Sequence, residues 1–343
     1  MGIVTSRTEP LSSEPRPRRS PHWRDALADA VTDTAELCRL LGLPPSILPA
    51  DGRDCGLPLL VPRTLLARMG HGDPSDPLLL QVLPQNREAA EQPGFSNDPV
   101  AEAKTTQSPG LIWKYQNRLL IVASAQCAVH CRFCFRRHFP YARSPRTREQ
   151  WGEILRGIAA AESIREVILS GGDPLTLDDD LLVWLAARLA EIPHLARLRV
   201  HTRLPIMIPQ RVTEKLLAWL RGTRLTPVVV IHVNHPAEID QSVAAALARL
   251  VDAGVPVLSQ SVLLRGVNDR VDVLATLFER LVDLRVMPYY LHQLDRVAGA
   301  AHFEVPEQDG IALVEQLRAR LPGYAVPRYV RQPPCGPSKV VLA

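Results

Sequence analysis

The octapeptide CAVHCRFC, residues 127–134, is the most informative part of the chain. It places three cysteines at C-x3-C-x2-C spacing, directly after the apolar and strand-like residues 119–125. Three thiolates can hold three corners of a [4Fe–4S] cube, whereas such clusters usually have four cysteine ligands. Cys127, Cys131 and Cys134 therefore predict a cluster with one open iron. An open coordination position is typical of a catalytic metal site.

A structural zinc site, or thiols with unrelated roles, would explain the same cysteines differently. Zinc knuckles usually add a second pair of Cys or His at short spacing, but Cys55 and Cys335 lie far away in sequence. Disulfides are disfavoured because the six cysteines are scattered and no secretory signal precedes them, which favours a reducing, cytoplasmic location. The spacing favours the iron–sulfur interpretation, with zinc as its alternative.

These residues resemble a known superfamily. C-x3-C-x2-C with an aromatic residue, Phe133, before the last cysteine is similar to the radical S-adenosylmethionine (SAM) superfamily, in which SAM chelates the open iron and is cleaved to a radical. Longer strings narrow the resemblance to the lysine 2,3-aminomutases, and most closely to the type that makes β-lysine for elongation factor P. They are CAVHCRFCFRRHFPY, SGGDPL, HVNHPAEID, QSVLLRGVND, MPYYLHQLD and a C-terminal Pro-Ser-Lys, and the similarity runs from about Val31 to Lys339.

The composition argues against two classes of protein. Hydrophobic residues make up 46% of the 343 residues and charged residues 22%, which is ordinary for a globular protein. No run of eighteen apolar residues is present, so no membrane span is expected. The net charge of +4 is too small and too evenly spread to indicate nucleic-acid binding.

The chain divides into four expected parts. The first part, rich in Pro, Ser and Arg, reads as a flexible tail, and apolar spacing then predicts one helix over residues 23–41 and another near residues 62–69. The expected boundaries are a tail over residues 1–24, an N-terminal helical cap and linker over 25–110, a barrel over 111–305, and a C-terminal helix with a lysine-bearing segment over 306–343.

Short β-branched runs alternate with amphipathic helices through the barrel part. Such βα units imply an α/β fold with parallel strands and helices outside them, and we expect a partial (β/α)6 radical SAM barrel. The predicted strands are residues 119–125, 166–170, 198–202, 227–233, 255–263 and 286–290, and the predicted helices are residues 149–161, 178–191, 211–220, 238–253 and 271–284.

Polar residues gather at the carboxyl ends of these strands, where α/β barrels build active sites. Gly171, Gly172 and Asp173 follow the second strand, and glycines let backbone groups approach a ligand closely. The resemblance implies that this segment contacts the amino group of SAM. It also implies that His232 and Gln260, on the fourth and fifth strands, contact the nucleoside part of SAM.

Lys339 is the candidate lysine for pyridoxal 5′-phosphate (PLP). Migration of an amino group needs a device that holds nitrogen while it moves, and the π-system of PLP provides one. A lysine near a C-terminus is usually solvated, so this role comes from the resemblance. Arg118 matches a family residue near PLP. The competitors are few, because the chain holds only four lysines, at positions 104, 114, 215 and 339.

The resemblance also implies the residues that bind a free amino acid. Arg136 matches the arginine that pairs with the substrate carboxylate, a role that suits a planar fork of donors. Asp295 matches the first of two acids that hold the far ammonium group. The second acid is replaced by Gln332, and incomplete compensation of a buried ammonium costs several kcal/mol.

The resemblance implies an isomerase that converts L-α-lysine to β-lysine with a [4Fe–4S] cluster, SAM and PLP. A separate ligase would then attach the product to elongation factor P, and an electron donor such as flavodoxin or ferredoxin would reduce the cluster. The sequence leaves the oligomeric state open, with a homo-oligomer as one option. Two alternatives remain, a related mutase for another amino acid such as glutamate, which Gln332 keeps open, and a non-enzymatic metal-binding scaffold.

Overall fold

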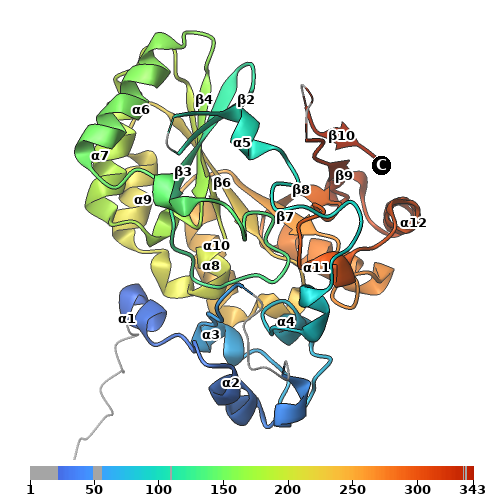
Figure 1. Ribbon diagram of the computed structural model, residues 1–343. Helices are drawn as coiled ribbons and strands as arrows, with labels where there is room; N and C mark the ends of the chain where they lie inside the picture. Colours follow the sequence, from blue (N-terminus) through green and yellow to red (C-terminus); the bar gives the residue numbers. More distant parts are fainter. Residues whose placement is uncertain (1–21, 49–55, 109, 335, 337) are drawn as a thin grey trace, which may run out of the picture.

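The computed structural model describes residues 22–48, 56–108, 110–334, 336 and 338–343. A sheet of ten strands, in which spatial order follows chain order from β1 to β10, forms the frame of this part of the chain (Figure 1). Most of the predicted N-terminal tail, together with Cys55 and Cys335, lies outside the described residues.

Six parallel strands make up the centre of the sheet. Each begins and ends within two residues of its predicted position, and the largest differences are that β7 begins two residues later and β8 ends two residues later. The central pairs are in regular parallel register, as in Leu119↔Val167 and Val200↔Val229. These strands are β3 (Arg118–Ser124), β4 (Glu166–Gly171), β5 (Arg197–Thr202), β6 (Thr226–His232), β7 (Val257–Val262) and β8 (Met287–His292).

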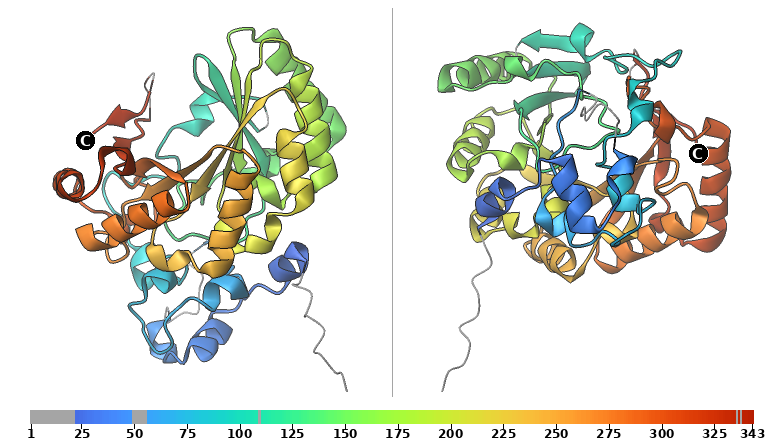
Figure 2. Two further views of the ribbon diagram at one scale, coloured as in Figure 1. Left: turned by 180° about the vertical axis from the view of Figure 1, so that it is seen from behind. Right: turned by 60° about the horizontal axis from the view of Figure 1, so that its bottom comes forward.

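Helices lie along the outer side of the curved sheet (Figures 1 and 2). Side-chain caps begin several of them: Thr147 accepts from the backbone N–H of Gln150, and Asp240 accepts from Val243 N–H at 2.9 Å. Their apolar faces pack on the strands, which buries one continuous core. The outer helices are α6 (Arg148–Ala160), α7 (Asp179–Ala190), α9 (Glu214–Arg221), α10 (Gln241–Asp252) and α11 (Val271–Asp283), with the short α8 (Leu204–Met207) after β5.

Both edges of the sheet carry strands that the sequence did not predict. At one edge, β1 (Thr106–Ser108) and β2 (Leu111–Tyr115) form an antiparallel hairpin beside β3. At the other edge, β9 (Arg328–Arg331) is parallel to β8, and β10 (Val340–Val341) is antiparallel to β9. The predicted α/β fold with a partial barrel is confirmed. The sheet is open, because β1 and β10 are its two edges and do not pair with each other.

The N-terminal section differs from its prediction. The expected single helix over residues 23–41 is wrong, because Val31 leaves the helical path and exchanges backbone hydrogen bonds with Val61 at 2.8 and 2.9 Å. Asp33 then caps a new helix by accepting from Glu36 N–H at 2.6 Å. The section holds α1 (Trp23–Ala28), α2 (Thr34–Leu41), α3 (Arg63–Leu66), α4 (Pro77–Leu80), the 3-10 turn η2 (Asn86–Ala89) and α5 (Glu102–Thr105).

The N-terminal helices and the C-terminal helix lie on different sides of the sheet. Helices α1 to α4 gather below the sheet in Figure 1 and across its end in the right-hand view of Figure 2. The predicted C-terminal helix is α12 (Glu307–Arg320), and it lies beside β9 on the side away from α6 and α7 (Figure 1). None of the described helices combines the length and the apolar character needed to cross a bilayer.

Candidate active site

A cavity of about 510 Å³ runs along the inner face of the sheet toward the carboxyl ends of its parallel strands. Alternate strand residues point into it, as the two-residue period of a strand requires, for example Arg199 and His201 on β5 and Tyr290 and His292 on β8. All residues predicted as site residues line this one cavity: Arg118, Cys127, Cys131, Cys134, Arg136, Gly171, Gly172, Asp173, His232, Gln260, Asp295, Gln332 and Lys339.

The three cysteines lie in the loop after β3 and are free thiols. Burial, together with the neighbouring thiols, raises the pKa of Cys127 well above its usual value and that of Cys134 to about 11. Thiolates at these positions therefore need positive charge beside them, which bound iron supplies. The cysteines thus fit a cluster chemically. Within the described ranges, no three His, Cys, Asp or Glu side chains are placed to bind a single metal ion.

Arg203, directly after β5, binds one of these cysteines. Its Nη1 donates to Cys131 Sγ at 2.7 Å, while Nη2 donates to Glu238 Oε2 at 3.0 Å and to Gln81 Oε1 at 2.7 Å. Burial would lower the pKa of Arg203, but Cys131 and Glu238 outweigh it and raise that pKa. Arg203 directly follows the predicted strand over residues 198–202, but the sequence gave no role to Arg203, Gln81 or Glu238.

Two buried acids of the N-terminal section hold the arginines of the cysteine loop. Glu88, on η2, accepts from Arg132 Nε at 2.8 Å and Nη2 at 2.6 Å, and from Arg137 Nη2 at 3.0 Å. Glu102, on α5, accepts from Arg136 Nε at 2.8 Å and Nη2 at 2.6 Å. The sequence gave no chemical role to this section, because an isolated acid in polar, Pro-rich sequence carries no pattern.

Arg136 is therefore not the free fork that the sequence suggested. Glu102 occupies the Nε–Nη2 edge of its guanidinium, and Nη1 donates to Ser170 Oγ at 3.1 Å. The side chain still lines the cavity, so Glu102 fixes which edge of the guanidinium faces a ligand. Its predicted contact with a substrate carboxylate stays a prediction.

The Gly171–Asp173 turn packs against the residues that lead into the cysteine loop. Gly171 has φ +125°, and a Cβ there would lie 2.7 Å from the carbonyl oxygen of Ser124, so the close approach requires glycine. The carboxylate of Asp173 accepts from Thr202 Oγ1 at 2.8 Å and from Arg203 N–H at 2.7 Å. It therefore ties β4 to the end of β5. The backbone N–H groups of Gly172 and Asp173 donate to Ser124 O at 2.7 Å and to Gln126 O at 2.6 Å, so these two donors hold the turn against the cysteine loop.

His232 and Gln260 are direct neighbours across the β6–β7 pair. Burial lowers the pKa of His232 to about 3, so the imidazole is neutral. A neutral ring pairs with Asn234 Oδ1, 3.1 Å from Nε2, and meets the Phe133 ring edge-on at 5.7 Å between centroids. The neutral ring and the neutral amide suit an uncharged ligand surface.

Lys339 enters the cavity from the start of β10. Its Nζ donates to Gln332 Oε1 at 2.5 Å and lies 5.8 Å from the centre of the Tyr290 ring. Burial lowers the pKa of Lys339 to about 8, and Asp295 opposes that shift. Burial raises the pKa of Asp295 to about 6, with Lys339 opposing. Two buried atoms that line this cavity, Tyr115 Oη and His201 Nε2, have no hydrogen-bond partner among the described residues.

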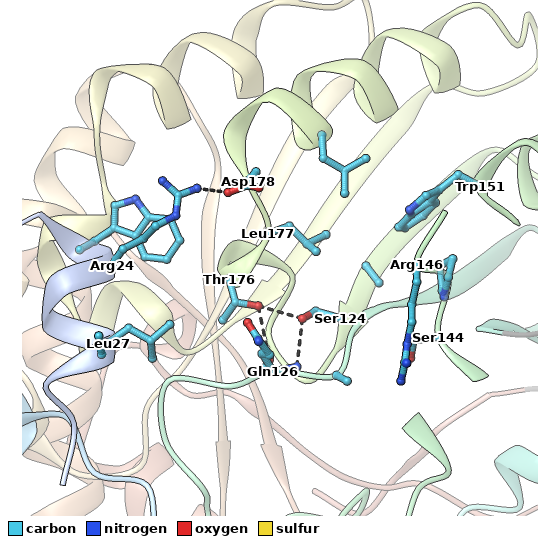
Figure 3. A pocket seen from close by; sticks show the side chains of 16 residues that line it. Arg24, Leu27, Ser124, Gln126, Ser144, Arg146, Trp151, Thr176, Leu177 and Asp178 are labelled. Atoms are coloured by element: carbon cyan, nitrogen blue, oxygen red, sulfur yellow. Dashed lines mark hydrogen bonds and ion pairs between the residues drawn. The ribbon is translucent and has the colours of Figure 1, made fainter. Parts of the chain in front are cut away.

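A second hollow, of about 610 Å³, lies on the outer side of the sheet between α1, the end of β3 and the start of α7 (Figure 3). Ser124 and Gln126 form part of its wall, and Ser124 Oγ lies 2.9 Å from Thr176 Oγ1. Arg24 and Asp178 form an ion pair across its rim (Figure 3). None of the predicted site residues lines this hollow, so it backs onto the cysteine loop from outside.

Comparison with known proteins identifies the family of this chain. The sequence profile of the radical SAM superfamily matches residues 121–277. An L-lysine 2,3-aminomutase of Haemophilus influenzae is 42% identical over 97% of this chain and 99% of its own length. The enzymes of that name from Escherichia coli and Buchnera aphidicola are 45% and 40% identical, each over 93% of this chain and over 94% and 95% of their own lengths. The chain therefore belongs to the lysine 2,3-aminomutase family of radical SAM isomerases.

Proposed function

We propose that this protein converts L-α-lysine to β-lysine with a [4Fe–4S] cluster, SAM and PLP. The observation that carries the proposal is the meeting of three free cysteines, Lys339 and Asp295 in one cavity. When bound, the cluster and SAM supply a radical that removes hydrogen, and PLP supplies a π-system that carries nitrogen between carbons. Substrate and product are isomers, so no net oxidant or reductant is consumed.

Cys127, Cys131 and Cys134 would hold the cluster, and the Gly171–Asp173 turn would face the amino group of SAM. His232 and Gln260 would face its nucleoside part. Their neutrality and their adjacent positions on β6 and β7 support this assignment. The raised pKa values of the buried thiols support a cation at the cysteines.

Lys339 would carry PLP. Two observations support this role: the side chain is held in the cavity, and its pKa is lowered to about 8. The lowered pKa favours the neutral amine, which is the nucleophile that such attachment requires. Arg118 lines the same cavity and would offset the PLP phosphate. The unpartnered Tyr115 Oη and His201 Nε2 would gain partners from a polar ligand there.

Arg136 and Asp295 would hold the two ends of the amino acid. Glu102 holds the Nε–Nη2 edge of the Arg136 guanidinium and Nη1 donates to Ser170 Oγ, so a carboxylate would bind through the second N–H of Nη1. Asp295 is a partly buried acid whose pKa is raised by burial, so an ammonium group beside it would stabilise its negative charge. A glutamate side chain would meet repulsion at the same place.

We also propose the narrower role in translation. The strings shared with the elongation factor P type of the family support a cytoplasmic enzyme whose β-lysine a separate ligase attaches to that factor. Flavodoxin or ferredoxin would supply the electron. Incubation of the product with the ligase and elongation factor P should add one lysyl mass to the factor, measured by intact mass spectrometry. This role would be rejected if the mass of the factor stayed unchanged with the enzyme product but rose with authentic β-lysine, the positive control.

Trapping experiments test the cofactor assignment. Borohydride reduction of PLP-loaded protein should place a pyridoxyl group on Lys339, located by peptide mapping. Lys215→Ala, at an exposed lysine of α9, should retain the adduct, whereas Lys339→Ala should lose it. Anaerobic protein with reductant and SAM should turn lysine into β-lysine, with many turnovers for each SAM consumed, because the isomerisation itself uses no net reductant. An adduct elsewhere, or deoxyadenosine without β-lysine, would contradict the proposed reaction.

Gln332 favours one second candidate, a mutase with relaxed selectivity for the side-chain end of its substrate. Its amide offers no charge to an ammonium, so ornithine and glutamate are compared with lysine at equal concentrations. Gln332→Glu should lower the KM for lysine about tenfold, which is about 1.4 kcal/mol. Glutamate turned over faster than lysine by the unmodified enzyme would replace the lysine proposal with this candidate.

A further inference from the structure

The Arg203 guanidinium that contacts Cys131 also donates to Gln81 and Glu238. Nη1 donates to Cys131 Sγ at 2.7 Å, and Nη2 donates both to Gln81 Oε1 at 2.7 Å and to Glu238 Oε2 at 3.0 Å. The guanidinium carbon lies 5.7 Å from the centre of the Phe133 ring. Arg203 is 7% exposed, and its hydrogen bonds to Cys131, Gln81 and Glu238 hold the guanidinium in place beside the cavity.

Glu238 is itself held firmly in place. It is fully buried, and its Oε1 accepts from Asn234 N–H at 3.0 Å, His235 N–H at 3.1 Å and Gln81 Nε2 at 3.2 Å. Its other oxygen is thus directed at Arg203. The result is a row of groups in which a carboxylate, a guanidinium and a cysteine sulfur follow one another in a buried setting.

Charge and hydrogen bonding at a cysteine sulfur control how readily an iron–sulfur cluster accepts an electron. A reduced cluster carries one more negative charge than the oxidised cluster, so a donor with a fixed positive charge stabilises the reduced form. Arginine is such a donor, because it keeps its proton under all ordinary conditions. A carboxylate behind it offsets part of that charge.

We propose that Arg203 is a positioning residue that, through Cys131, raises the reduction potential of the cluster, and that Glu238 limits this rise. The proposal rests on the proposed function only in requiring a [4Fe–4S] cluster on the three cysteines. It does not require lysine or PLP. It adds a purpose to the network that joins the N-terminal section, through Gln81, to the loop after β6, through Glu238.

The two ends of the row give opposite predictions. In Arg203→Met the donor and its charge are lost, so the equilibrium constant for one-electron reduction should fall at least tenfold, a shift of about 59 mV to more negative potential. In Glu238→Gln the guanidinium keeps its contact but loses its counter-charge, so the potential should move in the positive direction. Arg203→Lys keeps the charge without the planar fork and should lie between Arg203→Met and the unmodified protein.

The matched control is Arg199→Met. Arg199 lines the same cavity and pairs with Glu166 at 2.5 Å, and no contact joins it to a cysteine among the described side chains. The substitution removes one guanidinium from the same cavity but none from the cysteines, so the reduction potential of Arg199→Met should change far less than that of Arg203→Met. Each potential is measured by anaerobic redox titration with electron paramagnetic resonance, on reconstituted protein without PLP, SAM or lysine.

The outcomes separate cleanly. Opposite shifts in Arg203→Met and Glu238→Gln, with unchanged iron and sulfide content, support the proposal. If Arg203→Met does not retain the cluster, the other two variants test the proposal: the reduction potential should fall in Arg203→Lys and rise in Glu238→Gln. Equal potentials in all variants, shifts of one sign, or cluster loss in every variant would reject it in favour of a purely structural contact. Lysine turnover by the unmodified protein tests the proposed function independently.

Discussion

Lys339 lines the cavity, and its amine loses a proton more readily than that of an ordinary lysine. Its pKa is lowered to about 8 by burial, and only the neutral amine attacks a carbonyl. The rate of PLP attachment to cofactor-free protein should therefore rise with pH through about 8 and stay level above it. Absorbance of the attached cofactor, checked by borohydride trapping at each pH, measures the rate. A midpoint near the ordinary lysine value of about 10.4 would contradict this expectation.

Asp295 has the opposite shift, and its sign predicts a change in stability. Its folded-state pKa is raised to about 6, so the protonated carboxyl favours folding at low pH and that contribution is lost as pH rises through 6. Asp295→Asn should add about 3 kcal/mol to the free energy of unfolding of cofactor-free protein at pH 8. The gain should be less than half as large at pH 4.5. Urea titrations at both pH values measure it, and an equal gain at both would contradict the assigned cause.

Residue identities at the site divide into those that local sequence reveals and those that it hides. The three cysteines and the Gly171–Asp173 turn are local patterns, since their function depends on spacing within a few residues. Glu88 and Glu102 are different, because each acts on an arginine 34 or more positions away along the chain. Only the fold brings such pairs together.

At the scale of elements, the N-terminal section forms one wall of the cysteine loop. Backbone bonds join them as well: His130 N–H donates to Leu60 O at 3.1 Å, and Arg132 N–H donates to Gln81 O at 2.8 Å. The turn η2 and the helix α5 add buried carboxylates to these bonds. The two short elements η2 and α5 are thus fixed by polar contacts with the cysteine loop.

Removal of one such carboxylate should be costly. Glu88→Gln keeps the shape of the side chain but leaves two buried guanidinium groups without their carboxylate, which we expect to cost about 3–5 kcal/mol. Urea denaturation and the iron content after reconstitution measure the effect. Glu91→Gln, at an exposed acid of the same segment, should cost less than about 0.5 kcal/mol. Equal costs for the two variants would contradict the role of Glu88.

The same scale shows why the long elements were predictable. The helices α6, α7, α10 and α11 have 12 or 13 residues, enough to show a clear apolar face. The strands β1 and β10 have three and two residues, too few for alternation to be visible. The break at Val31 also escaped prediction, because its cause is pairing with the distant Val61.

At the scale of the whole molecule, the last strand holds the lysine in place. Leu342 N–H donates to Tyr329 O at 2.8 Å, and Tyr329 N–H donates to Ala343 O at 3.0 Å, so the final residues anchor the segment that carries Lys339. Removal of residues 340–343 should weaken PLP retention at least tenfold and leave the iron content unchanged. Equilibrium dialysis and iron analysis measure the two quantities. Val340→Ala keeps the backbone pairing and should retain PLP. If Val340→Ala lost PLP, the Val340 side chain and not the backbone pairing would be responsible.

The ordering of the sheet from β1 to β10 has a consequence for biosynthesis. About two hundred residues separate the cysteine loop from Lys339, and the ribosome releases the chain from its N-terminal side. Under the proposed function, the cysteines that would hold the cluster are thus translated long before the amine that would carry PLP. The maturing enzyme would acquire its means of generating radicals first and its nitrogen carrier last.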